Sequence, residues 1–162
     1  MSHWEAVGQS DEWYTPKYIF DSLGITFDLD VAAPASGPRH VPCLAFFYEN
    51  SLSKQWVGTV WMNPPFGGRN ALIPWLEKFC THGDGIALVP DRTSAPWFQK
   101  YAPRMDRLMF VSPKVKFERP DGSIGVSPGS GTCLMSIGEK ANKAMDRGRG
   151  LGMLLQTGLR GT

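Results

Sequence analysis

Short apolar segments alternate along this chain with amphipathic segments, and this alternation limits the fold more than any other feature. We expect strands at residues 25–31, 41–48, 57–62, 85–89, 107–111 and 132–137, and helices at residues 16–23, 70–80 and 95–101. Strands that alternate with helices are typical of an α/β layered fold, in which ligands bind at the carboxyl ends of the strands. The length of 162 residues fits one such domain. We therefore expect an α/β domain with a mostly parallel central sheet flanked by helices.

The ends of the first two expected helices carry specific signals. Thr15 can cap the first helix, Pro16 suits its first position, and Gly24 follows its last apolar residue. Asn70 is expected to cap the second helix. Pro74 must then lie in the first turn of that helix, because proline further along would break the hydrogen-bond ladder.

Composition excludes several classes of protein. The hydrophobic share of 42% provides for a packed core. The three cysteines, Cys43, Cys80 and Cys133, are far apart and form no C-x-x-C pair, so neither a disulfide framework nor a zinc site is expected. No segment approaches the roughly 20 apolar residues of a membrane span, and the polar N-terminus does not resemble a signal peptide. We expect a cytoplasmic protein with no metal and no membrane partner.

Charge is distributed unevenly along the chain. Residues 1–100 hold seven Lys and Arg against ten Asp and Glu, whereas residues 101–162 hold ten against five. A basic second part favours a polyanionic partner. Within it, residues 112–131 are rich in proline, glycine and charge and are long for a passive connection, and residues 139–162 are expected to form a frayed basic, glycine-rich tail.

The segment Asn63-Pro64-Pro65-Phe66 follows an apolar strand and carries the most specific chemistry in the sequence. The side-chain oxygen of Asn63 and the carbonyl oxygen of Pro64 can accept hydrogen bonds from the two N–H groups of an aromatic amine. The two prolines restrict the backbone, so the Pro64 carbonyl is held in place. Phe66 offers a face on which a base can stack. The pattern resembles the catalytic loop of amino-group methyltransferases that use S-adenosylmethionine.

The order of the surrounding segments makes this resemblance more specific. In sequence order these are residues 11–16 (DEWYTP), 27–33 (FDLDVAA), 50–56 (NSLSKQW), 60–66 (VWMNPPF) and 88–98 (LVPDRTSAPWF). This series resembles the phage-type DNA N-6-adenine methyltransferase family, and the resemblance runs from about residue 11 to 137. The resemblance implies a reduced Rossmann-like methyltransferase fold and a bacterial host or prophage context. It also implies transfer of a methyl group from S-adenosylmethionine, leaving S-adenosylhomocysteine, to an adenine flipped out of duplex DNA.

The same resemblance implies contacts with the cofactor. Thr15 and Pro16 look like the segment that meets its methionine end. Asp30 and Ala32 look like a degenerate first cofactor loop, which lacks the usual Gly-x-Gly. Either Glu49 or Asn50 stands near the expected ribose-binding position, and Asn63 adjoins the methyl donor.

Nucleic-acid contacts are expected from basic residues at the ends of strands and in the long segment 112–131. These are Arg69, Arg92, Lys114, Lys116 and Arg119. Such side chains position DNA through its phosphates and do not read its sequence. We expect a flexible segment 1–10, a methyltransferase domain at 11–138 with a DNA-facing loop at 112–131, and the tail at 139–162.

Two alternatives remain open at this point. The same loop chemistry serves the 4-amino group of cytosine and the side-chain amide of protein glutamine. A protein that keeps the fold and binds nucleic acid without catalysis is the other alternative, and the degenerate cofactor loop is its motivation.

Overall fold

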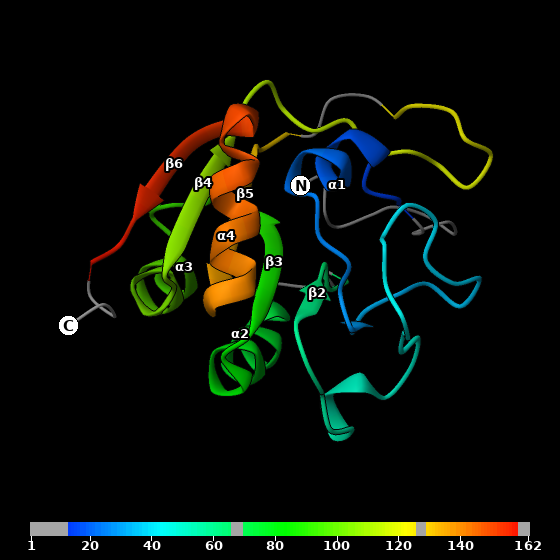
Figure 1. Ribbon diagram of the computed structural model, residues 1–162, viewed down its shortest axis with the longest axis horizontal. Helices are drawn as coiled ribbons and strands as arrows, with labels where there is room; N and C mark the ends of the chain where they lie inside the picture. Colours follow the sequence, from blue (N-terminus) through cyan, green and yellow to red (C-terminus); the bar gives the residue numbers. More distant parts are fainter. Residues whose placement is uncertain (1–12, 66–69, 126–128, 159–162) are drawn as a thin grey trace.

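Six strands and four α-helices make up the computed structural model, which describes residues 13–65, 70–125 and 129–158 (Figure 1). The strands are β1 (Leu29–Asp30), β2 (Val60–Met62), β3 (Gly85–Pro90), β4 (Arg107–Val111), β5 (Thr132–Ile137) and β6 (Gly152–Gln156). The helices are α1 (Lys17–Leu23), α2 (Leu72–His82), α3 (Pro96–Tyr101) and α4 (Glu139–Arg147), with short 3₁₀ turns at Ser51–Ser53, Ala102–Arg104 and Arg149–Leu151. The α/β class expected from the sequence is therefore confirmed.

The sheet is mixed, and the expectation of a mostly parallel sheet was wrong. The strand order is β1-β2-β3-β5-β4-β6. Strands β1, β2 and β3 pair in parallel, whereas β5 pairs antiparallel with both β3 and β4, and β6 pairs antiparallel with β4. The segment between β4 and β5 returns the chain to the sheet at the edge where β4 ended, so β5 must run in the opposite direction. Periodicity in the sequence predicts a strand but not its direction.

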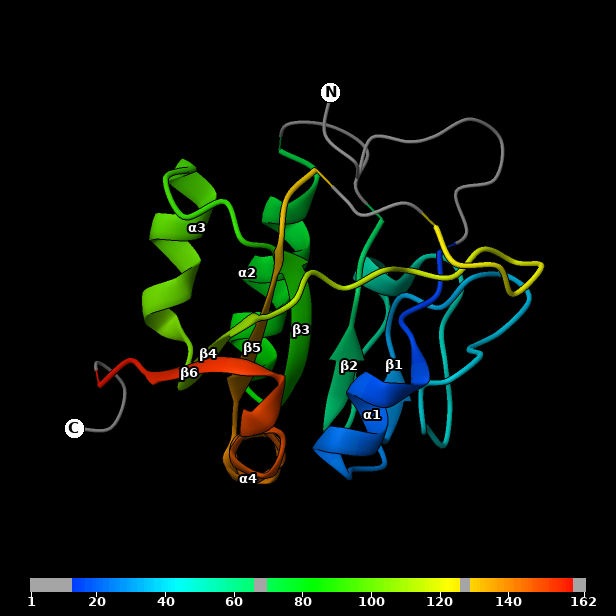
Figure 2. The ribbon, with the colours of Figure 1, turned by 90° about the horizontal axis from the view of Figure 1, so that it is seen from above.

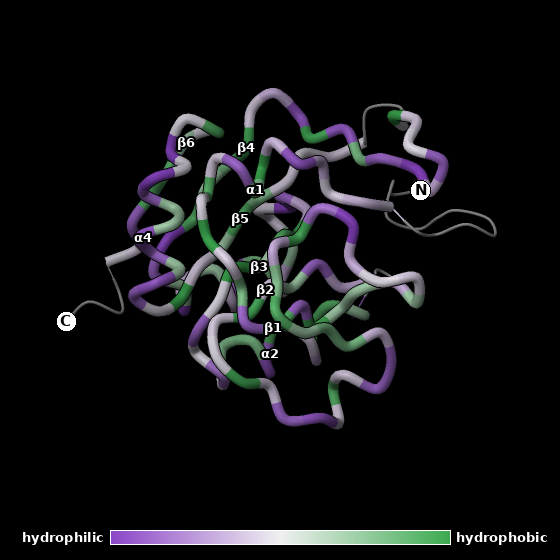
Figure 3. Tube along the Cα trace, turned by 45° about the vertical axis from the view of Figure 1, so that its right-hand side comes forward, coloured by the Kyte–Doolittle hydropathy of each residue, from purple (hydrophilic) through white to green (hydrophobic). Residues whose placement is uncertain are grey.

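Helices cover both faces of the sheet. Figure 2 shows α1 and α4 on one side and α2 and α3 on the other. One apolar core joins α2 and α3 to β2 and β3 through residues such as Leu76, Phe79 and Met62. The second joins α1 and α4 to the opposite face through residues such as Phe20, Trp61 and Met145. Hydrophobic residues accordingly concentrate along the central strands in Figure 3.

The first strand is shorter than the expected segment 25–31. Just before this strand, the side chain of Asp28 accepts a hydrogen bond from the backbone N–H of Thr59 (2.8 Å), the residue that precedes β2. Only Leu29 and Asp30 pair continuously with β2. Segment 41–48 lies beside this strand but pairs only through isolated bridges, so the second strand expected there was wrong. The two bridges, Phe27 with Cys43 and Asp30 with Phe46, do not join into a continuous ladder.

Both expected helix caps were wrong, although the helices themselves form. Helix α1 begins after Pro16, with no side-chain cap, and Gly24 ends it in the left-handed conformation as expected. Helix α2 begins after Ala71 rather than Asn70 and ends at Gly83. Pro74 is its third residue and lies in the first turn, as expected.

Residues 139–156, which we expected to belong to a frayed tail, are part of the folded domain. Helix α4 buries Ala141, Ala144 and Met145, and β6 pairs with β4 along its whole length. Gly138 takes a positive φ before α4, Gly148 ends this helix, and Gly152 is the first residue of β6. Glycine content alone therefore misled the sequence interpretation.

Candidate active site

Three parallel strands end at the same edge of the sheet and bring the predicted site residues to it. After β1 the chain turns at Val31–Ala33, after β2 it continues into Asn63, and after β3 it continues into Asp91. In the register of the sheet, Asp30 lies beside Trp61, two residues before Asn63. The sequence prediction that these segments meet at the carboxyl edge is consistent with this topology.

Asn63 lies beside Thr15 at this edge. The side-chain nitrogen of Asn63 donates a hydrogen bond to the hydroxyl of Thr15 over 3.3 Å. Thr15 is buried, Asn63 is half-buried and Pro64 is buried, whereas Pro65 is exposed. Phe66, the fourth residue of the predicted catalytic loop, lies outside the described residues. The structure thus joins two candidate residues that are 48 positions apart in the sequence.

Asp30 is a buried carboxyl group at the end of β1. Its residue is 3% exposed, and its side chain accepts a hydrogen bond from the backbone N–H of Ala32 over 3.1 Å. Burial raises the pKa of Asp30 to about 7, and the Ala32 hydrogen bond opposes this rise only in part. Among the described residues no Lys, Arg or His forms an ion pair with it. Within the described part of the chain, the site therefore contains a buried carboxyl group with no cationic partner.

Segment 41–50 follows the outer side of this turn. The N–H of Phe47 donates to the carbonyl of Asp30 (2.9 Å), and the N–H of Ala33 donates to the carbonyl of Phe47 (3.0 Å). Glu49 and Asn50, both exposed, follow Phe47 by two and three residues along the chain. The bonds of Phe47 therefore place them near this turn. Burial and the charge of Asp30 raise the pKa of the Cys43 thiol to about 11, which makes Cys43 a weak nucleophile.

A hairpin projects from the long segment between β4 and β5, at the same edge of the sheet. It turns over Arg119–Ser123, where the Asp121 carboxylate accepts hydrogen bonds from the N–H and hydroxyl of Ser123. Leading into it, Val115 and Phe117 are buried while Lys114 and Lys116 are exposed. The expected DNA-facing loop thus presents two lysines from a fixed backbone. Figure 1 shows the hairpin in yellow beside α1.

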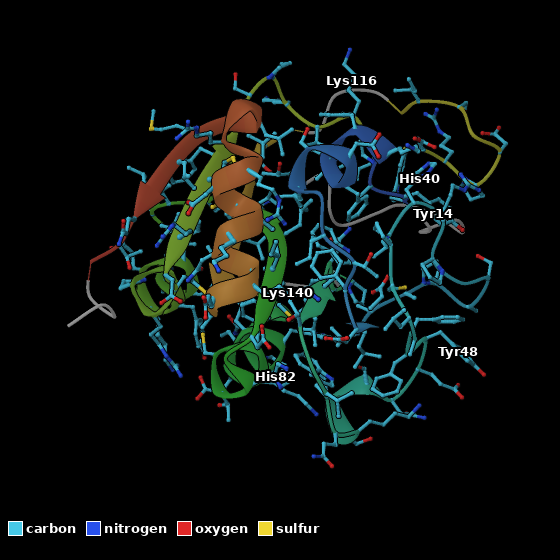
Figure 4. All side chains as sticks on the ribbon, viewed as in Figure 1. Tyr14, His40, Tyr48, His82, Lys116 and Lys140 are labelled. Carbon is cyan, nitrogen blue, oxygen red and sulfur yellow. The ribbon has the colours of Figure 1, made fainter. Side chains whose placement is uncertain are left out.

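A cluster that the sequence interpretation missed ties this hairpin to the turn after β1. His40 lies 3.0 Å from a Glu118 carboxylate oxygen, and Tyr14 and Glu118 exchange two backbone hydrogen bonds. The Tyr14 hydroxyl is hydrogen-bonded to that of Ser36 (2.8 Å). Figure 4 labels Tyr14 and His40 close together, with Lys116 above them. No local signal could have revealed the cluster, since its members come from three distant segments.

The remaining predicted basic residues differ in their surroundings. Arg92 is exposed in the turn after β3. The Arg119 guanidinium donates to the carbonyl of Ile124 (3.0 Å) and lies over the Trp13 ring, so it already holds the hairpin together. Arg69 lies outside the described residues.

An open hollow of about 480 Å³ lies at the opposite edge of the sheet from Asn63. Its lining residues are Gly83, Asp84, Gly138, Glu139, Lys140 and Lys143, which precede β3 or follow β5. Within the described ranges, no three His, Cys, Asp or Glu side chains are grouped as metal ligands require. In the same part of the chain, no helix is long and apolar enough to cross a membrane.

The α/β sheet thus carries a buried acid, an amide followed by two prolines and a basic hairpin at its carboxyl edge, the edge at which α/β sheets commonly bind ligands. A family model described as DNA N-6-adenine-methyltransferase (Dam) matches residues 4–155. The chain therefore belongs to this family, as its sequence motifs indicated, and the family implies the methyltransferase fold. Searches of the curated proteins and of the solved structures found no match.

Proposed function

We propose that this protein methylates the N6 amino group of adenine in duplex DNA, using S-adenosylmethionine as the methyl donor. The observation that carries the proposal is the position of Asn63 after β2, at the edge of the sheet that also holds the buried Asp30. Membership of the Dam family supports DNA as the substrate and a methyl group as the group transferred.

The proposed role of Asn63 and Pro64 is to make a poor nucleophile reactive. The lone pair of the adenine amino nitrogen is delocalised into the ring. The side-chain oxygen of Asn63 and the backbone oxygen of Pro64 accept hydrogen bonds from its two N–H groups and draw the nitrogen toward a tetrahedral shape. Pro64 and Pro65 fix the backbone so that this geometry needs little reorganisation. Phe66 is proposed to stack on the flipped base.

The residues at the end of β1 fit a positively charged cofactor. S-adenosylmethionine supplies the methyl group and carries a sulfonium and an ammonium charge. The Asp30 carboxyl is buried and has no cationic partner among the described residues, so a cationic group beside it compensates its charge and favours its ionised form. Ala32 keeps the turn small, Thr15 and Pro16 are proposed contacts of the methionine end, and Glu49 or Asn50 is the proposed ribose ligand.

DNA is proposed to lie across the carboxyl edge, against the exposed Lys114 and Lys116 of the hairpin. Arg92 and Arg69 are proposed to bind phosphates next to the catalytic loop. The Arg119 guanidinium is already engaged within the hairpin, so its proposed contribution to DNA binding is to keep the lysines in position. These contacts orient the duplex, and the flipped adenine enters beside Asn63.

The test is methyl transfer to duplex DNA, followed by mass analysis of the digested nucleosides. We expect 6-methyladenine from the wild type. An Asn63→Ala protein should keep its fold, by circular dichroism and melting temperature, and lose at least about 100-fold in kcat. Gln55→Ala, which removes an exposed amide on the segment before β2, is the matched control.

The alternatives differ in the product that they predict. If the product is 4-methylcytosine, the target base is cytosine and the proposed chemistry of the loop still holds. A wild type that binds DNA and S-adenosylhomocysteine but forms no methylated nucleoside would refute the proposed activity. Titration calorimetry with S-adenosylhomocysteine then tests cofactor binding by itself. A non-catalytic relative that has lost cofactor binding would show no heat of binding.

A further inference from the structure

The Asn63 side chain poses a problem of orientation that the proposed function does not solve. An amide group carries an oxygen that accepts hydrogen bonds and a nitrogen that donates two, and a half-turn exchanges them with almost no change in shape. Only one orientation presents the oxygen to the adenine amino group. In the other, two N–H₂ groups face each other and neither can accept.

In the structure, the Asn63 amide has its nitrogen turned toward the Thr15 hydroxyl. The Asn63 nitrogen donates to the Thr15 hydroxyl oxygen at 3.3 Å, which leaves the amide oxygen on the side away from Thr15. The backbone around Thr15 is held on both sides. Tyr14 pairs with Glu118 through two hydrogen bonds of 2.8 and 2.9 Å, and Pro16 leads directly into α1.

Thr15 does not have the helix-capping role that its sequence position suggested. It does not cap α1, because no side-chain hydrogen bond reaches the first turn of that helix. The residue is only 6% exposed, so its hydroxyl has little access to bulk water. In the structure this hydroxyl accepts the hydrogen bond from the Asn63 nitrogen.

We propose that Thr15 is a positioning residue, which holds the Asn63 amide with its oxygen turned toward the adenine amino group. This inference rests on the proposed function and extends it by one residue. It has a specific consequence, because an aspartate at position 63 would offer an oxygen in either orientation. The contribution of Thr15 should therefore depend on whether residue 63 is an amide or a carboxylate.

A double-mutant cycle tests this dependence, with Thr15→Val measured in the wild type and in Asn63→Asp. Valine keeps the shape of threonine and removes the hydroxyl. In the wild type we expect kcat on duplex DNA to fall by about tenfold or more, as expected for loss of one oriented hydrogen bond. All rates are measured at saturating S-adenosylmethionine, so that a change in cofactor affinity does not enter kcat, and Thr15→Ser should restore kcat. In Asn63→Asp, the same Thr15→Val change should cost less than about threefold.

A second readout does not depend on activity. The side-chain N–H₂ resonances of Asn63 in the nuclear magnetic resonance spectrum should shift in Thr15→Val and return in Thr15→Ser. Those of Gln55, which is exposed, should not move.

Two results would overturn the inference. These are equal losses of kcat in both backgrounds and unchanged Asn63 resonances in Thr15→Val. Equal losses would indicate that Thr15 acts through the cofactor alone. A wild type that forms no methylated nucleoside would refute the proposed function, and the resonance experiment would still decide whether Thr15 orients Asn63.

Discussion

The guanidinium carbon of Arg39 lies 3.9 Å from the centre of the Tyr14 ring. The same guanidinium donates hydrogen bonds to the backbone carbonyls of Arg119 and Pro120, at the tip of the hairpin. One side chain therefore links the segment after β1 to both the N-terminal segment and the proposed DNA-facing hairpin. The hairpin is held to the segment after β1 by contacts between residues about 80 positions apart.

Replacing Arg39 should loosen this hairpin. In Arg39→Gln the two carbonyl contacts and the ring contact are lost, and we expect local opening to become easier by about 1–2 kcal/mol. Hydrogen exchange at the amides of Gly122 and Gly125, which are bonded within the hairpin, measures this. Arg104→Gln, which removes an exposed ion pair with Glu77, is the control. Unchanged hydrogen-exchange rates at these amides in Arg39→Gln would show that the hairpin is stable without the Arg39 contacts.

The buried Asp30 should make stability depend on pH in an unusual direction. Its pKa is about 7 in the folded protein and about 4 in an unfolded chain, so the folded state binds the proton more tightly between these values. The free energy of unfolding should therefore fall as pH rises from about 4 to about 7, by up to about 4 kcal/mol.

Comparison with Asp30→Asn isolates this contribution from those of other acids. The variant should be more stable than the wild type at pH 8, with the difference vanishing near pH 4, when measured by urea denaturation. It should also bind S-adenosylhomocysteine more weakly, because the uncharged amide no longer attracts the ammonium group. Asp21→Asn, an exposed residue paired with Lys17, should have a small effect on both. A stability difference that is the same at every pH would contradict the prediction.

Lys114 and Lys116 should contribute to DNA affinity through phosphates. Replacing both with glutamine should weaken binding to all duplex sequences alike. The slope of log K against log salt concentration should become shallower by about 2. Fluorescence anisotropy over a range of salt concentrations measures this. The control pair is Lys140→Gln with Lys143→Gln, on α4 near the opposite edge of the sheet. A slope that changes equally in both pairs would argue against a DNA-facing hairpin.

Gly85 at the start of β3 should not tolerate a side chain. A Cβ atom there would lie 2.4 Å from the carbonyl oxygen of Val60 on the neighbouring strand. We expect Gly85→Ala to destabilise the protein by about 1–3 kcal/mol, since β2 and β3 must move apart. Thermal unfolding measures the loss. Gly129→Ala, where no atom lies within 4 Å of the added carbon, should leave the melting temperature within about 2 °C. An unchanged melting temperature in Gly85→Ala would mean that the strands adjust freely.

Local patterns determined most of the elements of this protein. The apolar residues that predict β3, β4, β5, α2 and α3 also form the cores, because a segment with one apolar face must bury it wherever it lies. The Asn63-Pro64-Pro65-Phe66 motif predicted an amino-group methyltransferase, since its chemistry depends on adjacent residues. The order of five short segments along the chain then predicted the family.

Only the tertiary structure decided the strand directions, the folding of residues 139–156 into the domain and the partners of the site. The direction of β5 depends on how the long segment before it returns to the sheet, and β6 is stable only because β4 is beside it. The Thr15–Asn63 hydrogen bond and the Arg39 contacts join residues that local periodicity does not relate. The raised pKa of Asp30 likewise depends on burial by distant segments, because a side chain loses water only when the whole chain folds around it.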